Sequence, residues 1–153
     1  MRISLRVDYG IRAMIELAAH HGNEPLKAEH IATSQAMPLK YLLGILADLR
    51  RAGMLRSQRG PDGGFHLHRP ASAITVGEVF RALEGPLADV HDASLRDLTY
   101  PTPAEHLPTV WMAVRGSLRR VLDTVTIADL VTGDLPAEVD ELAREYGRSS
   151  RPA

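Results

Sequence analysis

The chain has 153 residues and a formal net charge of -1, which suits one domain plus an extension with a sizeable core. No apolar run approaches the roughly 20 residues that cross a bilayer, and the N-terminus lacks a signal-peptide pattern, so we expect a cytoplasmic protein with no membrane partner. The sequence contains no cysteine, which excludes disulfides, Cys-based zinc sites and thiolate-held iron-sulfur clusters. We therefore expect no cofactor.

Charge is divided unevenly along the chain. Residues 1–70 carry 10 Lys and Arg against 6 Asp and Glu, whereas residues 71–153 carry 8 against 13. Cationic side chains displace condensed counterions from DNA, so the first half is the candidate for phosphate contact. Ordinary solvated surface charge is the alternative.

Three helices are predicted in the first third of the chain. Apolar residues recur at three- and four-residue spacing over residues 8–20 and within two later segments, Lys27 to Gln35 and Pro38 to Ala52. Pro38 suits the first helical position, where its missing N–H is not needed. A short helix, a tight turn and a longer helix have the spacing of a helix-turn-helix, whose second helix enters the major groove of DNA.

The exposed face of the third helix supplies the first candidate DNA contacts. Tyr41 either donates to phosphate or packs on the preceding helix. Leu43, an apolar residue on a polar face, can contact a thymine methyl group. The alternative is that it has no such role, because single exposed leucines are common on protein surfaces. Gly44, which costs a helix about 1 kcal/mol relative to Ala, relieves crowding against DNA or a neighbouring helix. We assign to DNA the residues Lys40, Tyr41, Leu43, Gly44 and Arg51, and with them Arg2 and Ser4 of the opening MRIS.

A glycine-tipped hairpin follows the third helix. Two short strands, Leu55–Arg59 and Phe65–Arg69, flank the turn GPDGG, which provides a proline and three glycines for a tight reversal. Such a wing can bring an arginine to the minor groove, where the negative potential favours it. A hairpin that only covers the core would not need two arginines beside a turn that consists mostly of glycine. The assigned wing contacts are Arg56, Arg59, Gly60 and His66.

Two histidines share one face of the second strand. His66 and His68 could chelate a metal, but no third ligand is evident nearby and no HExxH pattern occurs. We prefer solvent-facing histidines that can touch phosphate.

A capping box, Thr75 to Glu78, begins a fourth helix that runs to about Leu83. Residues 87–108 hold three prolines and four acidic groups without a period, so they read as a long loop, a kind that is often functional. A helix follows Pro108, then a short helix from Thr126 to Val131 and a charged helix that ends near Tyr146.

The helix after Pro108 has an apolar face too wide for contact with a small winged domain alone. We therefore predict that it packs against a second copy of the chain. A two-fold homodimer would present two recognition helices to a pseudo-palindromic site. The residues assigned to this contact are Val110, Trp111, Val114, Leu118, Val121 and Leu122.

The predicted fold class is mainly α with a small β-hairpin: a winged helix-turn-helix domain plus a long C-terminal dimerisation helix. The domain covers residues 1–84 and the loop residues 85–108. The dimerisation and C-terminal helices cover 109–147, and 148–153 form a flexible tail.

Several segments at matching spacing resemble the bacterial winged-helix transcriptional regulators that include IscR, NsrR and CymR, the Rrf-type family. They are MRIS with DYGIRAM, YLLGILADLRRAGML, RSQRGPDGGFHL, ITVGEVFRALEGP and VLDTVTIADLV, and the resemblance covers residues 1 to about 132. It implies a homodimer with crossing C-terminal helices and with wing and recognition helix on DNA. Many members hold an iron-sulfur cluster through three cysteines in the loop corresponding to 87–108, and this chain has none.

Asp8 stands where a nitric-oxide sensor of that family has an acidic cluster ligand. Without cysteines we expect Asp8 to cap the first helix or pair with a nearby arginine. The remaining metal or effector alternative would join Asp8 with His91, Asp92 or His106.

The sequence thus predicts a cluster-free, homodimeric transcriptional regulator that binds double-stranded DNA at a promoter site, with a small molecule or partner protein as its input and repression as its expected action. The alternatives are a winged-helix module that binds protein and a regulator with a non-cysteine metal site. An enzyme is not expected, because no nucleophile-base pairing, phosphate-binding loop or paired carboxylates occur.

Overall fold

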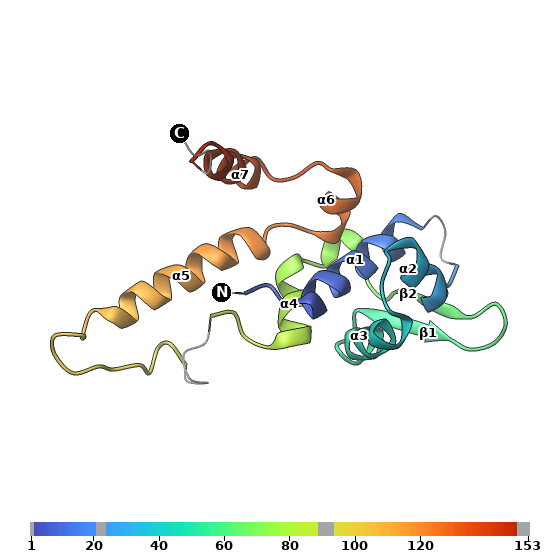
Figure 1. Cartoon of the computed structure of the whole chain (residues 1–153), viewed down its shortest axis with the longest axis horizontal. Coiled ribbons are helices and arrows are strands. Elements are labelled where there is room, and N and C mark those ends of the chain that lie inside the picture. The colour runs from blue at the N-terminus through green and yellow to red at the C-terminus, as the bar shows by residue number, and fades with distance from the viewer. Residues whose placement is uncertain (1, 21–23, 89–93, 150–153) are drawn as a thin grey trace.

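The computed structural model describes residues 2–20, 24–88 and 94–149. Helices α1–α4 and α6 gather with the hairpin at one end of the molecule, while α5 extends away from them (Figure 1). The mainly helical fold with one two-stranded antiparallel sheet confirms the predicted class. The elements are α1 (Leu5–Ala19), α2 (Ala28–Ser34), α3 (Leu39–Arg51), β1 (Leu55–Gln58), β2 (Gly64–Leu67), a 3-10 turn (Ala71–Ala73), α4 (Val76–Glu84), α5 (Leu107–Leu122), α6 (Ile127–Thr132) and α7 (Ala137–Ser149).

Helix α1 is the centre of the core. It packs against α3, α4, α6 and β2, and Ala13 and Met14 are completely buried. The helix begins three residues before the predicted start because the Ser4 hydroxyl caps it by accepting a hydrogen bond from the Val7 N–H at 3.2 Å. Of the two roles expected for Asp8, the cap is taken by Ser4, and Asp8 instead pairs with a nearby arginine, Arg12, at 3.2 Å.

Helices α2 and α3 form the predicted helix-turn-helix. The turn contains Ala36 with a φ of +53°, and Pro38 is the N-cap of α3 rather than its first residue. One face of α3 is fully buried, and each such side chain contributes about 1.5–3 kcal/mol relative to exposure. The buried positions are those expected from the three- and four-residue spacing of the apolar residues: Leu42, Ile45, Leu46 and Leu49.

The hairpin is tied to the helical core on one side. Its register runs from Leu55 opposite Leu67 to Gln58 opposite Gly64, so both strands are shorter than predicted. Leu26, just before α2, exchanges two backbone hydrogen bonds of 2.8 Å with Phe65. Because Phe65 pairs with Ser57 beside the turn, this contact attaches the wing to the core close to its tip.

A second backbone contact joins α4 to the C-terminal helices. The Val76 N–H donates to the Val125 carbonyl at 2.9 Å, and the Ile127 N–H donates to the Ile74 carbonyl at 2.9 Å. Within α5 only Pro108 is buried. Helix α7 runs to Ser149, past the predicted end near Tyr146, so the tail does not begin at 148. None of the described helices combines the length and the hydrophobicity that a bilayer-spanning segment needs.

Gly64 offers a test of how the wing is attached. Its φ is +153°, and a Cβ there would lie 2.5 Å from the Leu26 carbonyl oxygen, whereas Gly60 has a φ of +104° and open space. We expect Gly60→Ala to cost about 1 kcal/mol of unfolding free energy from backbone strain. Gly64→Ala should cost about 1–3 kcal/mol more because the bridge to Leu26 must open. Urea denaturation measures both, and equal decreases in stability would contradict this account.

Candidate DNA-binding surface

The N-terminal half of α3 presents the predicted contact residues to solvent. Lys40, Leu43 and Gly44 are exposed, and a Cβ built on Gly44 would point into open space, with no other described part of the chain within 4 Å beyond its own helix backbone. Tyr41 packs edge-on against Tyr9 of α1, with ring centroids 5.8 Å apart. The ring therefore rests on α1 rather than on the preceding helix, while 39% of Tyr41 remains exposed.

The acidic residue of α3 is neutralised by two arginines. Asp48 forms ion pairs with Arg6 of α1 and with Arg51 at the end of α3. Because the carboxylate is paired, it repels an approaching phosphate less than a free carboxylate would. Arg51, assigned above to DNA, thus already has a partner within the protein, although its side chain is 71% exposed.

The wing continues this cationic surface. Arg56, Arg59 and Gly60 are all exposed. Arg50 donates from Nη1 to the Ser57 hydroxyl at 3.0 Å, which connects the end of α3 to β1. Arg50 was not among the predicted contacts, although it belongs to the basic pair that ends the helix. We name the exposed surface formed by Lys40, Tyr41, Leu43, Gly44, Arg50, Arg51, Arg56, Arg59 and Gly60 the basic face.

Three other predicted contacts lie differently. Arg2 is exposed ahead of α1, but the Ser4 hydroxyl caps α1 and donates to Glu84. His66 is half-buried and lines a pocket of about 480 Å³ with His20 and His68. Its Nδ1 is buried and has no hydrogen-bond partner in the part of the chain that the structure describes. The expectation that His66 faces solvent is wrong, because β2 packs against α1.

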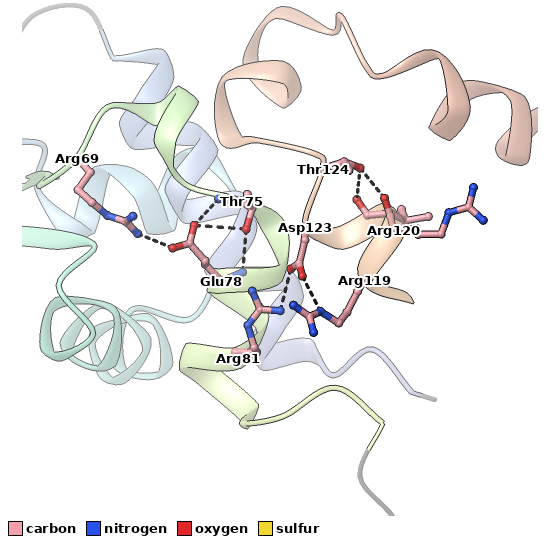
Figure 2. A network of polar contacts seen from close by, with 9 residues as sticks. Arg69, Thr75, Glu78, Arg81, Arg119, Arg120, Asp123 and Thr124 are labelled. Atoms are coloured by element: carbon pink, nitrogen blue, oxygen red, sulfur yellow. Dashed lines mark hydrogen bonds and ion pairs between the residues drawn. The ribbon is translucent and has the colours of Figure 1, made fainter. Parts of the chain in front are cut away.

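The wing is connected to α4 through Glu78 (Figure 2). The Glu78 carboxylate accepts from the Arg69 guanidinium at 3.0 Å and from the Thr75 N–H at 2.9 Å, which completes the predicted capping box. Partial burial opposes its charge, yet the hydrogen bonds from Thr75 and Arg69 outweigh that effect and hold the pKa of Glu78 below its usual value.

Asp123 connects α4 to the end of α5 in the same network. Its carboxylate lies 2.8 Å from Arg81 of α4 and accepts from Arg119 Nε at 3.1 Å (Figure 2). Partial burial raises the pKa of Asp123, but the hydrogen bonds and positive charges of Arg81 and Arg119 lower it by more, so the pKa lies below its usual value. Gly77 makes the contact possible, because a Cβ there would collide with the Asp123 carboxylate and meet the Leu122 carbonyl at 3.1 Å. We call this contact the α4–α5 joint.

An apolar groove of about 610 Å³ runs along the other end of the molecule between α5 and α7. Val110 and Val114 are 52% and 41% exposed, and Leu142 of α7 is 46% exposed. The groove contains five of the six residues predicted for dimer contact, whereas Trp111 is not part of its lining. The lining residues are Ile3, Val110, Ala113, Val114, Ser117, Leu118, Val121, Leu122 and Leu142.

The residues proposed as metal ligands do not form a site in the described ranges. Asp8 pairs with Arg12 at 3.2 Å, and His106 is 91% exposed with only Glu105 beside it at 3.7 Å. His91 and Asp92 lie outside the described residues. No group of three His, Asp or Glu within the described ranges could hold a metal ion. Since the sequence also lacks cysteine, a thiolate-held cluster does not fit this chain.

A helix-turn-helix whose exposed helix continues into an arginine-bearing wing defines a winged-helix DNA-binding protein. The chain belongs to the Rrf2 family, described as iron-dependent transcriptional regulators, whose pattern matches residues 3–133. It is accordingly a transcriptional regulator and not an enzyme.

The sequences and structures of related proteins match this chain over most of its length. A protein of Mycobacterium tuberculosis described as an HTH-type transcriptional regulator, Rv1287, is 41% identical over 95% of this chain and 91% of its own. CymR of Bacillus subtilis is 37% identical over 86% of this chain and 91% of its own. Its structure, described as that of the global cysteine regulator, superposes with a TM-score of 0.72 over 86% of this chain and 97% of CymR. The structure of T. potens IscR superposes with a TM-score of 0.68, 34% identity and 88% coverage of both chains.

The α4–α5 joint should depend on pH through Asp123. Because its pKa is lower in the folded chain, the unfolded chain binds more protons in acid, and the stabilisation present at neutral pH is lost below about pH 4. We expect Asp123→Asn to lower the free energy of unfolding by about 1 kcal/mol at pH 7 and by less at pH 3.

Urea denaturation at the two pH values measures this difference. Asp134→Asn is the control, since Asp134 is exposed and its side chain has no ion pair in the described part of the chain. A destabilisation by Asp123→Asn that is equal at pH 7 and pH 3 would show that the charge of Asp123 is not what stabilises the joint.

Proposed function

We propose that the chain is a homodimeric repressor that binds a pseudo-palindromic promoter site without an iron-sulfur cluster. It acts in the cytoplasm, and its input is a small molecule or a partner protein. The observation that carries the proposal is the basic face, whose exposed residues lie on α3 and on the hairpin and are connected by the hydrogen bond from Arg50 to Ser57. The apolar groove on α5, at the other end of the molecule, supports the dimer.

The basic face suits duplex DNA in two ways. The N-terminal residues of α3 are exposed, as base readout in the major groove requires, and Leu43 offers an apolar surface to a thymine methyl. Arg59, beside the exposed wing tip, can reach the minor groove or its phosphates. Phosphate contacts position the protein, whereas Lys40 and Leu43 at the start of α3 would distinguish sequences.

The groove favours a second copy of the same chain as its occupant. Several large apolar side chains of α5 are exposed, including Val110 and Val114, and a monomer gains nothing from that exposure. A two-fold axis across α5 would bury the same groove on both chains and turn two recognition helices to one side of a duplex.

Arg59→Ala tests the contact of the wing with DNA. We expect weaker binding to every fragment, and a plot of log K against log salt whose slope is shallower by about 0.9 for each phosphate that the wing no longer neutralises. A mobility shift with the chain's own upstream region, repeated at several salt concentrations, measures both. Arg148→Ala on α7 removes the same charge and should leave the slope unchanged.

An unchanged slope for Arg59→Ala would exclude the wing from phosphate contact. If the unmodified protein shifts no fragment even at low salt, the winged fold serves a protein partner instead.

Val114→Asp tests the dimer. A carboxylate in the middle of the groove would be buried without a partner, so the variant should sediment as a monomer while it keeps its helical circular-dichroism signal. Met112→Asp is the matched control, because Met112 is as exposed as Val114 on the same helix but does not line the groove. Sedimentation velocity measures both variants, and a dimeric Val114→Asp protein would place the interface elsewhere.

A further inference from the structure

A second hollow lies against α5 and has the opposite chemistry to the apolar groove. It holds about 470 Å³ between α5 and the segment around Leu95. Arg96 reaches it from that segment, and Arg115 and Arg119 reach it from successive turns of α5. We call it the arginine pocket.

The arginines of this pocket have free hydrogen-bonding capacity. In the described part of the chain neither the Arg96 nor the Arg115 side chain donates a hydrogen bond or forms an ion pair. Arg119 shares the Asp123 carboxylate with Arg81 of α4. Guanidinium groups gathered around one hollow repel one another unless an anion lies among them. Their planar donors match phosphate and carboxylate oxygens in pairs.

The hollow is built to admit a small molecule. Leu95 is only 2% exposed and holds its segment against the protein, while Met112 provides an apolar wall. Gly116, one of the lining residues, leaves open space where a side chain would begin. The volume falls within the roughly 300–1,000 Å³ that small-molecule sites occupy.

The position of the pocket keeps it accessible in the proposed dimer. None of its lining residues lines the apolar groove, and at 100° per residue Arg115 and Arg119 lie about 100–160° around α5 from Val114 and Val121. A second chain seated in the groove would therefore leave the arginine pocket open.

We propose that the arginine pocket binds a small metabolite with at least two phosphate or carboxylate groups, and that this metabolite is the effector. An anion in the pocket competes with Asp123 for Arg119. Asp123 also holds Arg81, so binding would loosen the α4–α5 joint and change the angle between the two winged domains of the dimer. The regulatory half of this proposal rests on the proposed function, whereas anion binding does not.

Calorimetric titration of the full-length free protein tests the site without DNA. Pyrophosphate and citrate are the probes, at constant ionic strength and up to 10 mM. We expect one of them to bind once per chain, and the preferred probe identifies phosphate or carboxylate as the recognised group. Arg96→Gln and Arg115→Gln should each raise the Kd of the probe at least about tenfold, because each removes a charge-assisted hydrogen bond.

Arg148→Gln is the control for net charge and should bind like the unmodified protein. Failure of both probes to bind, or equal weakening by Arg115→Gln and Arg148→Gln, would overturn the pocket as an anion site. If duplex DNA displaces the probe and Arg115→Gln weakens DNA binding as much as Arg59→Ala does, the pocket is a DNA contact and the proposal is wrong.

The regulatory half has a separate readout. A saturating concentration of the preferred probe should change the affinity for the upstream fragment at least about fivefold, a typical allosteric coupling, and Arg115→Gln should abolish that change. Unaltered DNA affinity in the presence of bound probe would contradict an effector role. A protein that binds the probe but no DNA would instead refute the proposed function and leave the site intact.

Discussion

The winged domain and the α5 arm meet where the Asp123 carboxylate lies between Arg81 and Arg119, with Gly77 leaving room for it. Two backbone hydrogen bonds, from Val76 to Val125 and from Ile127 to Ile74, close the same junction. When a second chain binds α5, the junction within each chain determines how the basic face of that chain is oriented toward DNA. The ion pairs of the joint are partly exposed, so a competing anion can displace them at small cost while the backbone hydrogen bonds remain.

The remainder of the winged domain keeps the basic face rigid. The buried side of α3 is apolar and packs on α1, so its exposed side is fixed in direction. Backbone pairing between Leu26 and Phe65 holds the second strand of the wing near its turn, and the Glu78 carboxylate joins Arg69, after β2, to the start of α4. The two regions that would touch DNA are thus positioned by a common core, and the Gly60 turn between the strands is left free to adjust.

Much of the fold could be predicted from local sequence, because periodicity, capping boxes and glycine-rich turns act over a few residues. The buried face of α3 and the capping box at Thr75 were found in this way. The Ser4 cap that sets the start of α1 is also a local signal in the sequence. Contacts between distant segments could not be found in this way, since the burial of His66 depends on β2 meeting α1. For the same reason the Asp123 joint and the arginine pocket have no local signature, since their members come from separate elements.

The central claim is that two chains joined through α5 press their basic faces on one duplex. Native mass spectrometry of the protein with its own upstream fragment measures this most directly, because it counts the chains in the complex. The account predicts two chains per duplex and a dimer in the free protein. A complex with a single chain per duplex, or a free protein that is monomeric throughout the concentration range of binding, would contradict it.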